Sequence, residues 1–247
     1  MSEGVFTVRP GETVTAFALG PLVERPFNGE PAPLRDTVDY RFVNGFTDVG
    51  HLPCRVATWD EIKSRPTPEL EEFVISEIRL PGFSRRLDFS GFWHLPNRLS
   101  RWARTRMTPP QEGLCSFNLA TCGGVHIWVD GALITRFEPF TRNQVQHTDI
   151  MLPLKAGGSD VVILAEEMAE RDTNFFVELC WNGPGDLAVS VPGKADAESL
   201  NALMELARAV RPAKVGFGAD DNLCLVFDAP TSGPATIVGR VGQSVHM

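Results

Sequence analysis

Apolar and polar side chains alternate with a period of two along most of residues 87–191, and this pattern restricts the fold more than any other feature. In residues 175–181 the odd positions are Phe, Val, Leu and Trp, and residues 115–119 alternate in the same way. Turn signals such as Asp130-Gly131 and Gly157-Gly158 separate these runs. Many short strands between closely spaced turns are typical of an antiparallel sandwich or barrel. The chain is therefore predicted to be mostly β.

Composition narrows the class of protein. The 247 residues, 43% of them hydrophobic, can bury a core without disulfides or a metal. The net charge of -8 argues against nucleic acid as the main partner, because phosphate binding needs clustered Lys and Arg. No run approaches the roughly 18 apolar residues of a membrane span, and the first residues lack a signal-peptide pattern. With five cysteines and no C-x-x-C pair, we expect a cytoplasmic protein with no membrane partner.

Residues 103–164 carry the most distinctive local pattern. A strand-like run at 125–129 ends in Asp130-Gly131, residues 137–140 read Phe-Glu-Pro-Phe, and Thr148-Asp149-Ile150 precedes a Leu-Pro-Leu-Lys-Ala-Gly-Gly turn. This block resembles the galactose-binding-domain-like jelly roll, the sugar-binding domain of glycoside hydrolase family 2 and related large glycoside hydrolases. Asp130 stands where that family usually has asparagine, and Thr148 precedes the Asp-Ile pair instead of following it. The resemblance implies an antiparallel jelly-roll β-sandwich and specifies no ligand.

The pattern changes on both sides of this block. Prolines break residues 1–70, which nevertheless hold many aromatics, and we expect strands near 14–19 and 39–43 and one helical turn near 59–63. An apolar stripe from Asp196 to Val210 predicts a helix, and strand character resumes at 214–218, 223–227 and 235–241. We divide the chain into an N-terminal arm packed on the sandwich (1–70), the jelly roll (71–192), a linker helix (193–212) and the start of a second, truncated β domain (213–247). A longer natural protein is expected.

Candidate sugar-binding residues follow from chemistry, because sugars bind to aromatic faces and to a few convergent polar groups. Trp128 alternates with the apolar residues of 125–129, so it is a candidate to face outward. The alternative is that it packs on the second face of the sheet, under the arm. One rim of the jelly roll, residues 136–143, adds polar candidates, or else forms a loop held by its own aromatics. These candidates are Arg136, Glu138, Arg142 and Asn143.

Residues 166–172 form the sharpest polar cluster, which we place in a loop. From it Glu170, Arg171 and Asp172 join the ligand-binding candidates. Glycosidases need two carboxylates at a defined separation, and acids within one loop do not establish such a pair. A solvated acidic turn is one alternative, and a structural Ca²⁺ held by loop carboxylates is another. We expect no further cofactor and no catalytic residue in this segment.

Arginines are concentrated between residues 85 and 106. This stretch is interpreted either as a surface for an anionic glycan, such as a uronic acid polymer, or as the solvent face of a strand. The histidines show no zinc-ligand spacing, and no phosphate-binding loop or nucleophile elbow is present in the sequence. The arginines are Arg85, Arg86, Arg98, Arg101, Arg104 and Arg106.

Three functional hypotheses stay open. The first is a non-catalytic carbohydrate-binding or scaffolding N-terminal region of a larger glycoside hydrolase-like protein. Its partners would be an oligosaccharide or polysaccharide and a downstream catalytic domain. The second is a stand-alone sandwich-fold hydrolase or lyase that uses Glu138 with the carboxylates of residues 166–172. The third is a purely structural or oligomerising sandwich, since a fold alone does not determine function.

Overall fold

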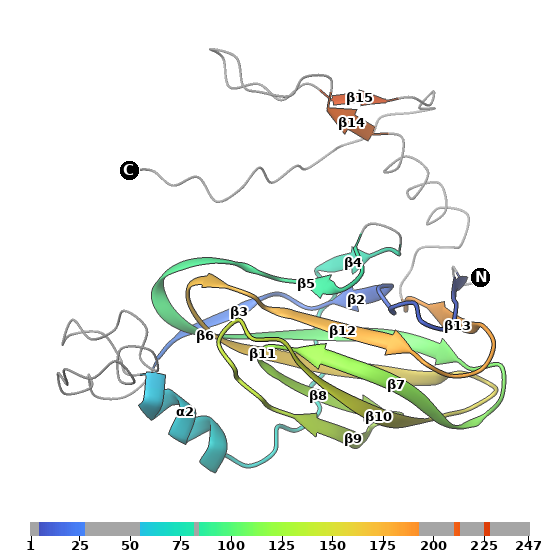
Figure 1. Cartoon of the computed structure of the whole chain (residues 1–247), viewed down its shortest axis with the longest axis horizontal. Helices are drawn as coiled ribbons and strands as arrows, with labels where there is room; N and C mark the ends of the chain where they lie inside the picture. Colours follow the sequence, from blue (N-terminus) through green and yellow to red (C-terminus); the bar gives the residue numbers. More distant parts are fainter. Residues whose placement is uncertain (1–4, 28–54, 82–83, 193–209, 213–224, 228–247) are drawn as a thin grey trace. The chain divides into compact units, whose positions relative to one another are not determined.

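The computed structural model describes residues 5–27, 55–81, 84–192, 210–212 and 225–227 (Figure 1). Contacts divide the chain into two compact units, Val5–Pro192 and a second unit containing Gly193–Met247. Of the second unit only strands β14 (Val210–Pro212) and β15 (Leu225–Phe227) are described, and they pair antiparallel.

The larger of the two sheets in Val5–Pro192 is built around a pair of long strands, β6 (Gly91–Thr108) and β11 (Ser159–Thr173). The remaining strands are β1 (Val5–Val8), β2 (Phe17–Leu19), β3 (Val23–Pro26), β4 (Glu77–Arg79), β8 (Gly124–Val129), β9 (Ala132–Phe137) and β13 (Leu187–Ser190). The order is β1-β13-β6-β11-β8-β9; β2 and β3 also pair with β6, and β4 pairs with β2. The N-terminal segment thus contributes strands to this sheet.

The smaller sheet has the order β10-β7-β12-β5 and lies face to face with the larger one (Figure 1). Its strands are β5 (Leu87–Asp88), β7 (Gly113–Thr121), β10 (Gln146–Leu154) and β12 (Phe176–Trp181). All pairings are antiparallel. The prediction of a mostly β, antiparallel sandwich is confirmed; the jelly-roll topology stays a prediction.

The core between the sheets follows the predicted alternation. Phe117 and Leu119 of β7 are fully buried, and Phe117 lies against Trp181 of β12 with 5.0 Å between ring centroids. Ile163 of β11 is buried on the facing side. The turn between β8 and β9 is also as expected, since Asp130 and Gly131 both adopt positive φ, at 49° and 86°.

The outer face of the larger sheet departs from the alternating pattern because a helix covers part of it. Helix α2 (Arg55–Ser64) places Ile62 in an apolar cluster with Met168 of β11, Phe27 and Phe140, and Trp59 packs against that cluster. The helical turn expected near 59–63 is therefore a ten-residue helix. The described part of the chain contains no helix with the length and hydropathy that crossing a bilayer requires.

Two local predictions need correction. The double glycine Gly123-Gly124 in the sequence predicts a tight connection with positive φ, but neither residue has it. A Cβ on Gly123 would instead lie 2.0 Å from the backbone oxygen of Glu166, so close approach of two chains demands glycine there. Val210–Pro212, assigned to the end of the linker helix, are strand β14. The expected strands at 39–43, 214–218 and 235–241 and residues 196–209 of the helix lie outside the described residues, and the domain boundaries stay predictions.

We predict that Phe117→Ala lowers the free energy of unfolding by about 3–5 kcal/mol, because it removes a buried ring from between the sheets and leaves a cavity. Urea denaturation measures this loss. Leu114→Ala on the same strand, 69% exposed in the wild type, should change stability by no more than about 0.5 kcal/mol. Equal effects of the two substitutions would contradict the assignment of the core.

Candidate functional site

The outer face of the larger sheet gathers charged side chains from distant parts of the chain. In the register of β6, β11 and β8, Leu164 lies between Trp102 and His126, and Glu166 lies between Ser100 and Gly124. Side chains at these positions therefore point to one face. Two further groups reach this face from outside these three strands, Arg65 directly after α2 and Glu138 directly after β9.

Glu166 is the centre of an ion-pair network although it is only 2% exposed. Arg65 Nη1 donates to Glu166 Oε1 at 2.8 Å, and Arg65 Nη2 donates to Glu166 Oε2. Arg98 Nη2 also donates to Glu166 Oε1, at 2.9 Å. A buried carboxylate is tolerated only when charge-assisted hydrogen bonds replace its hydration, and here two guanidiniums provide them.

Glu138 is the second carboxylate of this network. It accepts hydrogen bonds from Arg65 Nη2 at 3.1 Å and from Arg136 Nε at 2.5 Å. His126, which is fully buried, has Nε2 3.3 Å from Glu138 Oε1 and Nδ1 3.9 Å from Glu166 Oε2. Arg65 therefore ties both carboxylates to the segment that follows α2.

The protonation of the two carboxylates differs with their surroundings. Burial opposes the charge of Glu138, but the nearby His126 and the hydrogen bonds from Arg136 and Arg65 outweigh it and lower its pKa from 4.5 to about 2. For Glu166, deeper burial raises the pKa, and the charge and hydrogen bonds of Arg65 act against that rise. Glu138 is thus firmly ionised at neutral pH.

The same residues have the donor types of a metal site. One atom each from His126, Glu138 and Glu166 lies within 4.8 Å of the others. However, Arg65 Nη2 already donates to one oxygen of each carboxylate. A bound cation would have to displace that guanidinium, and Arg98 and Arg136 would still oppose it. Calcium is a still poorer fit to these three side chains, since it requires six to eight oxygen ligands.

An open hollow adjoins the network on the side of β3. Its volume is about 170 Å³, and Leu164 and Val23 supply apolar wall between its polar side chains. Half-buried Trp102 lies in its lining. The ring of Phe73 is stacked on the ring of Trp102, with 6.2 Å between the ring centroids. The polar lining consists of Arg25, Arg65, Glu71, Arg98, Ser100 and Glu166.

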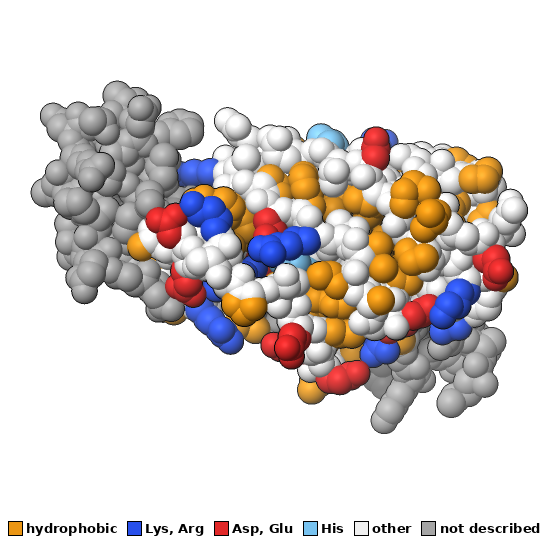
Figure 2. Space-filling view, turned by 90° about the horizontal axis from the view of Figure 1, so that it is seen from below, with side chains coloured by type: hydrophobic (Ala, Val, Ile, Leu, Met, Phe, Trp, Pro, Cys, Tyr) orange, Lys and Arg blue, Asp and Glu red, His pale blue; other side chains and the backbone are white. Residues whose placement is uncertain are grey.

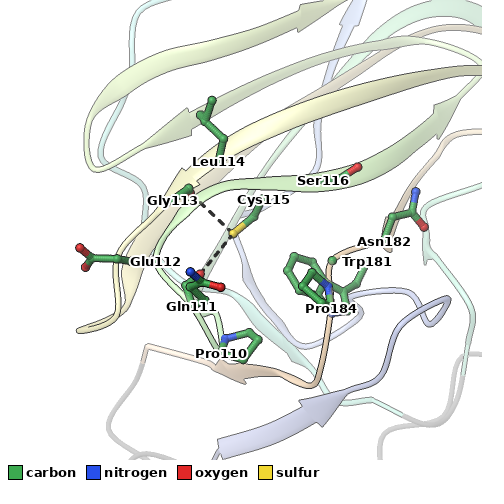
Figure 3. Close-up of a pocket in the computed structure, with 11 residues that line it drawn as sticks. Pro110, Gln111, Glu112, Gly113, Leu114, Cys115, Ser116, Trp181, Asn182 and Pro184 are labelled. Atoms are coloured by element: carbon green, nitrogen blue, oxygen red, sulfur yellow. Dashed lines mark hydrogen bonds between the residues drawn. The ribbon is translucent and has the colours of Figure 1, made fainter.

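A second hollow, of about 320 Å³, lies where the β6–β7 connection meets the end of β12 (Figure 3). The sulfur of Cys115 points toward the backbone oxygens of Gln111 and Gly113. Trp181 belongs to the lining but is only 1% exposed, and its Nε1 donates to the backbone oxygen of Gly185. This hollow therefore offers little aromatic surface to a ligand.

The acidic cluster of residues 166–172 is not a solvated loop, and that interpretation is corrected. The cluster belongs to strand β11, and Glu166, Glu167 and Glu170 are buried. A register shift between Ala169 and Arg171 interrupts the pairing there, and Arg171 has a φ of 57°. Arg171 and Asp172 are exposed beyond this shift.

The predicted rim residues separate into two groups. Arg136 and Glu138 join the network described above. Arg142 lies 3.9 Å from Glu170 Oε2, and Asn143 donates to the backbone oxygen of Asp172 and accepts from the backbone nitrogen of Asn174. The contacts of Arg142 and Asn143 hold the connection formed by residues 138–145 against the end of β11.

Trp128 does not present its ring to solvent. It is 3% exposed and lies 5.4 Å from Trp102, in a cluster with Val162 and Leu164. The alternative of a packed tryptophan therefore describes its position. Binding by the predicted residues stays a prediction.

Sequence reasoning missed the residues that organise this site. Arg65 and His126 were not candidates, Arg98 was considered only as part of the arginine-rich stretch, and Glu166 only as a loop acid. Alternation within each strand does not by itself show that His126 and Glu166 share a face. That conclusion also needs the register between β8 and β11. No local signal distinguishes Arg65.

The arginine-rich stretch is largely neutralised within the fold. Arg101 donates to Glu77 at 2.7 Å, Arg104 to Asp160 at 2.8 Å, and Arg86 lies 3.4 Å from Asp88. Figure 2 shows the same tendency on the face it presents, where Lys and Arg side chains lie beside Asp and Glu. These pairs reduce the positive charge that the stretch offers to a ligand, and its interpretation as a surface for an anionic glycan stays a prediction.

Comparisons with known proteins give no family. No protein-family model matches the chain, and no curated protein matches its sequence. Among solved structures, it is similar to the GH31 alpha-xylosidase of Xanthomonas citri, with 10% identity over 47% of this chain and a TM-score of 0.28. A beta-glucosidase from Kluyveromyces marxianus gives 12% identity over 57% of this chain and a TM-score of 0.32.

A family 35 carbohydrate binding module from an environmental isolate gives 15% identity over 47% of this chain and 82% of that module, with a TM-score of 0.27. The match spans only 15% and 17% of the two glycosidases. The neighbours thus include glycoside hydrolases and a carbohydrate-binding module. At these scores the likeness carries no argument about the site, and membership of the galactose-binding-like family stays a prediction.

We predict that Arg65→Ala lowers the free energy of unfolding by about 3–5 kcal/mol, because it leaves the buried Glu166 charge without its main partner. Arg104→Ala, which breaks a half-exposed pair, should cost about 1 kcal/mol or less. Chemical denaturation of the two variants and the wild type measures these losses in unfolding free energy. Glu166→Gln in the Arg65→Ala background should restore part of the loss; no recovery would contradict the buried-charge explanation.

The lowered pKa of Glu138 predicts how stability depends on pH. A carboxylate with a folded pKa of about 2 and an ordinary value of 4.5 contributes stability above pH 4.5 that is lost as pH falls toward 2. Glu138→Gln should therefore flatten the fall in unfolding free energy across this window. Glu69→Gln at an exposed position is the control for removing a carboxylate, and an unchanged slope in Glu138→Gln would refute the assignment.

Proposed function

We propose that this protein is a non-catalytic carbohydrate-binding module, with its ligand in the hollow beside Trp102. The observation that carries the proposal is the composition of that hollow, where part of an indole ring lies among convergent guanidinium, hydroxyl and carboxylate groups. Such a combination suits a sugar, whose C–H faces pack on aromatic rings and whose hydroxyls take planar polar partners. The volume, below the roughly 300 Å³ of common small-molecule sites, suits a single sugar ring.

The state of the carboxylates supports a binding role over hydrolysis. Glu138 and Glu166 come together, as the hydrolase hypothesis requires, but each accepts hydrogen bonds from two guanidiniums. A general acid must be able to give up a proton to the leaving group, and a nucleophile must reach the sugar. Glu166 is buried and occupied on both oxygens, so neither role suits it. A downstream catalytic domain stays a prediction from the sequence.

The two hollows allow a matched test, because each contains one half-buried serine. Ser100→Leu fills the hollow beside Trp102, and Ser116→Leu fills the hollow at the end of β12. Using isothermal titration against a panel of neutral and acidic oligosaccharides, we expect Ser100→Leu to abolish binding and Ser116→Leu to preserve it. Thermal melting confirms that both variants fold.

The reverse result would move the site to the second hollow. Absence of binding to every sugar would favour a scaffolding or oligomerising role. Hydrolysis of aryl glycosides by the wild type, lost in Glu166→Gln, would replace the proposal with the enzyme hypothesis.

A further inference from the structure

Two arginines face each other in the wall of the hollow. Arg25 of β3 and Arg98 of β6 are direct partners in the antiparallel register, and both line the hollow. Directly opposed like charges destabilise a sheet. Such a pair is tolerated when acidic groups, from the protein or from a ligand, compensate the repulsion.

The two guanidiniums are compensated to different degrees. Arg98 donates to Glu166 at 2.9 Å and lies 3.6 Å from Glu61. Arg25 is exposed, and within the described part of the chain it forms no ion pair. Of the two acids in the lining, Glu166 is already occupied by Arg65 and Arg98, and Glu71 is exposed to solvent. Within the described residues the positive charge of Arg25, on the β3 side of the hollow, therefore has no carboxylate partner.

We propose that this hollow selects a sugar that carries a carboxylate, a uronic acid residue, with the carboxylate held between Arg25 and Arg98. This inference rests on the proposed function. A carboxylate is planar and matches the paired N–H groups of a guanidinium, which makes it a better partner than a neutral hydroxyl. The sugar ring would then lie toward Ser100 and Trp102, which are next along β6 on the same face.

The test compares acidic and neutral sugars of the same linkage by isothermal titration. The probes are α-1,4-linked trigalacturonate against trigalactose, and β-1,4-linked triglucuronate against cellotriose. We expect one uronate to bind at least about tenfold more tightly than its neutral counterpart, as one charge-assisted hydrogen bond would give. Raising NaCl from about 50 to about 500 mM should weaken only the acidic ligand.

Arg25→Gln is the diagnostic variant, because Arg25 is exposed and outside the buried network. It should weaken uronate binding about tenfold and leave any neutral-sugar binding unchanged. Arg104→Gln, on the same face of β6 but paired with Asp160, is the matched control and should change uronate binding less than about twofold.

The outcomes separate the two proposals. Equal binding of acidic and neutral sugars, or uronate binding that Arg25→Gln does not weaken, overturns the uronate inference and leaves the binding module standing. Failure of every sugar to bind overturns both.

Discussion

The pairing of β6 with β11 is the interaction on which the rest of the structure depends. These two long strands run antiparallel from Ser159 opposite Met107 to Thr173 opposite Gly91, and together they carry the N-terminal strands on one side and β8 on the other. Their inner face forms the core against the smaller sheet. Their outer face is also largely covered, so both parities of β11 are buried over most of its length. On a strand that is covered on both faces, each polar side chain needs a hydrogen-bond or charge partner in the protein, because its hydration is lost.

Glu166 shows how that requirement is met. A carboxylate at the centre of the sheet loses its hydration, and the fold replaces it with guanidiniums from two separate elements, Arg65 after α2 and Arg98 on β6. Because breaking such an arrangement leaves a buried charge, it holds the segment after α2 against the sheet. Gly123 belongs to the same arrangement, since only glycine admits the backbone of Glu166 at that distance. The ion pairs that stabilise this part of the fold therefore also form part of the wall of the candidate ligand site.

The position of the hollow beside this network has a functional consequence. Arg65 and Arg98 are held in place by Glu166, so the proposed ligand would meet groups that are already oriented. Binding to oriented groups avoids much of the entropy lost when flexible side chains are ordered. This order of the site is consistent with the proposed binding role, because its carboxylates already accept hydrogen bonds within the fold.

The sequence by itself determined the class of fold, since period-two alternation in strands such as 115–119 and 175–181 leaves only one side of each strand for the core. It also located the turn at Asp130-Gly131, because that dipeptide accepts positive φ. It could not locate the site. The meeting of Arg65, Arg98, His126 and Glu166 depends on which strands are neighbours and on their register, and these are set by pairings between residues far apart in the chain. Residues 166–172 read as a polar loop because charge is normally solvated. Only the tertiary structure pairs them with β6 and brings the guanidiniums of Arg65 and Arg98 to the buried Glu166.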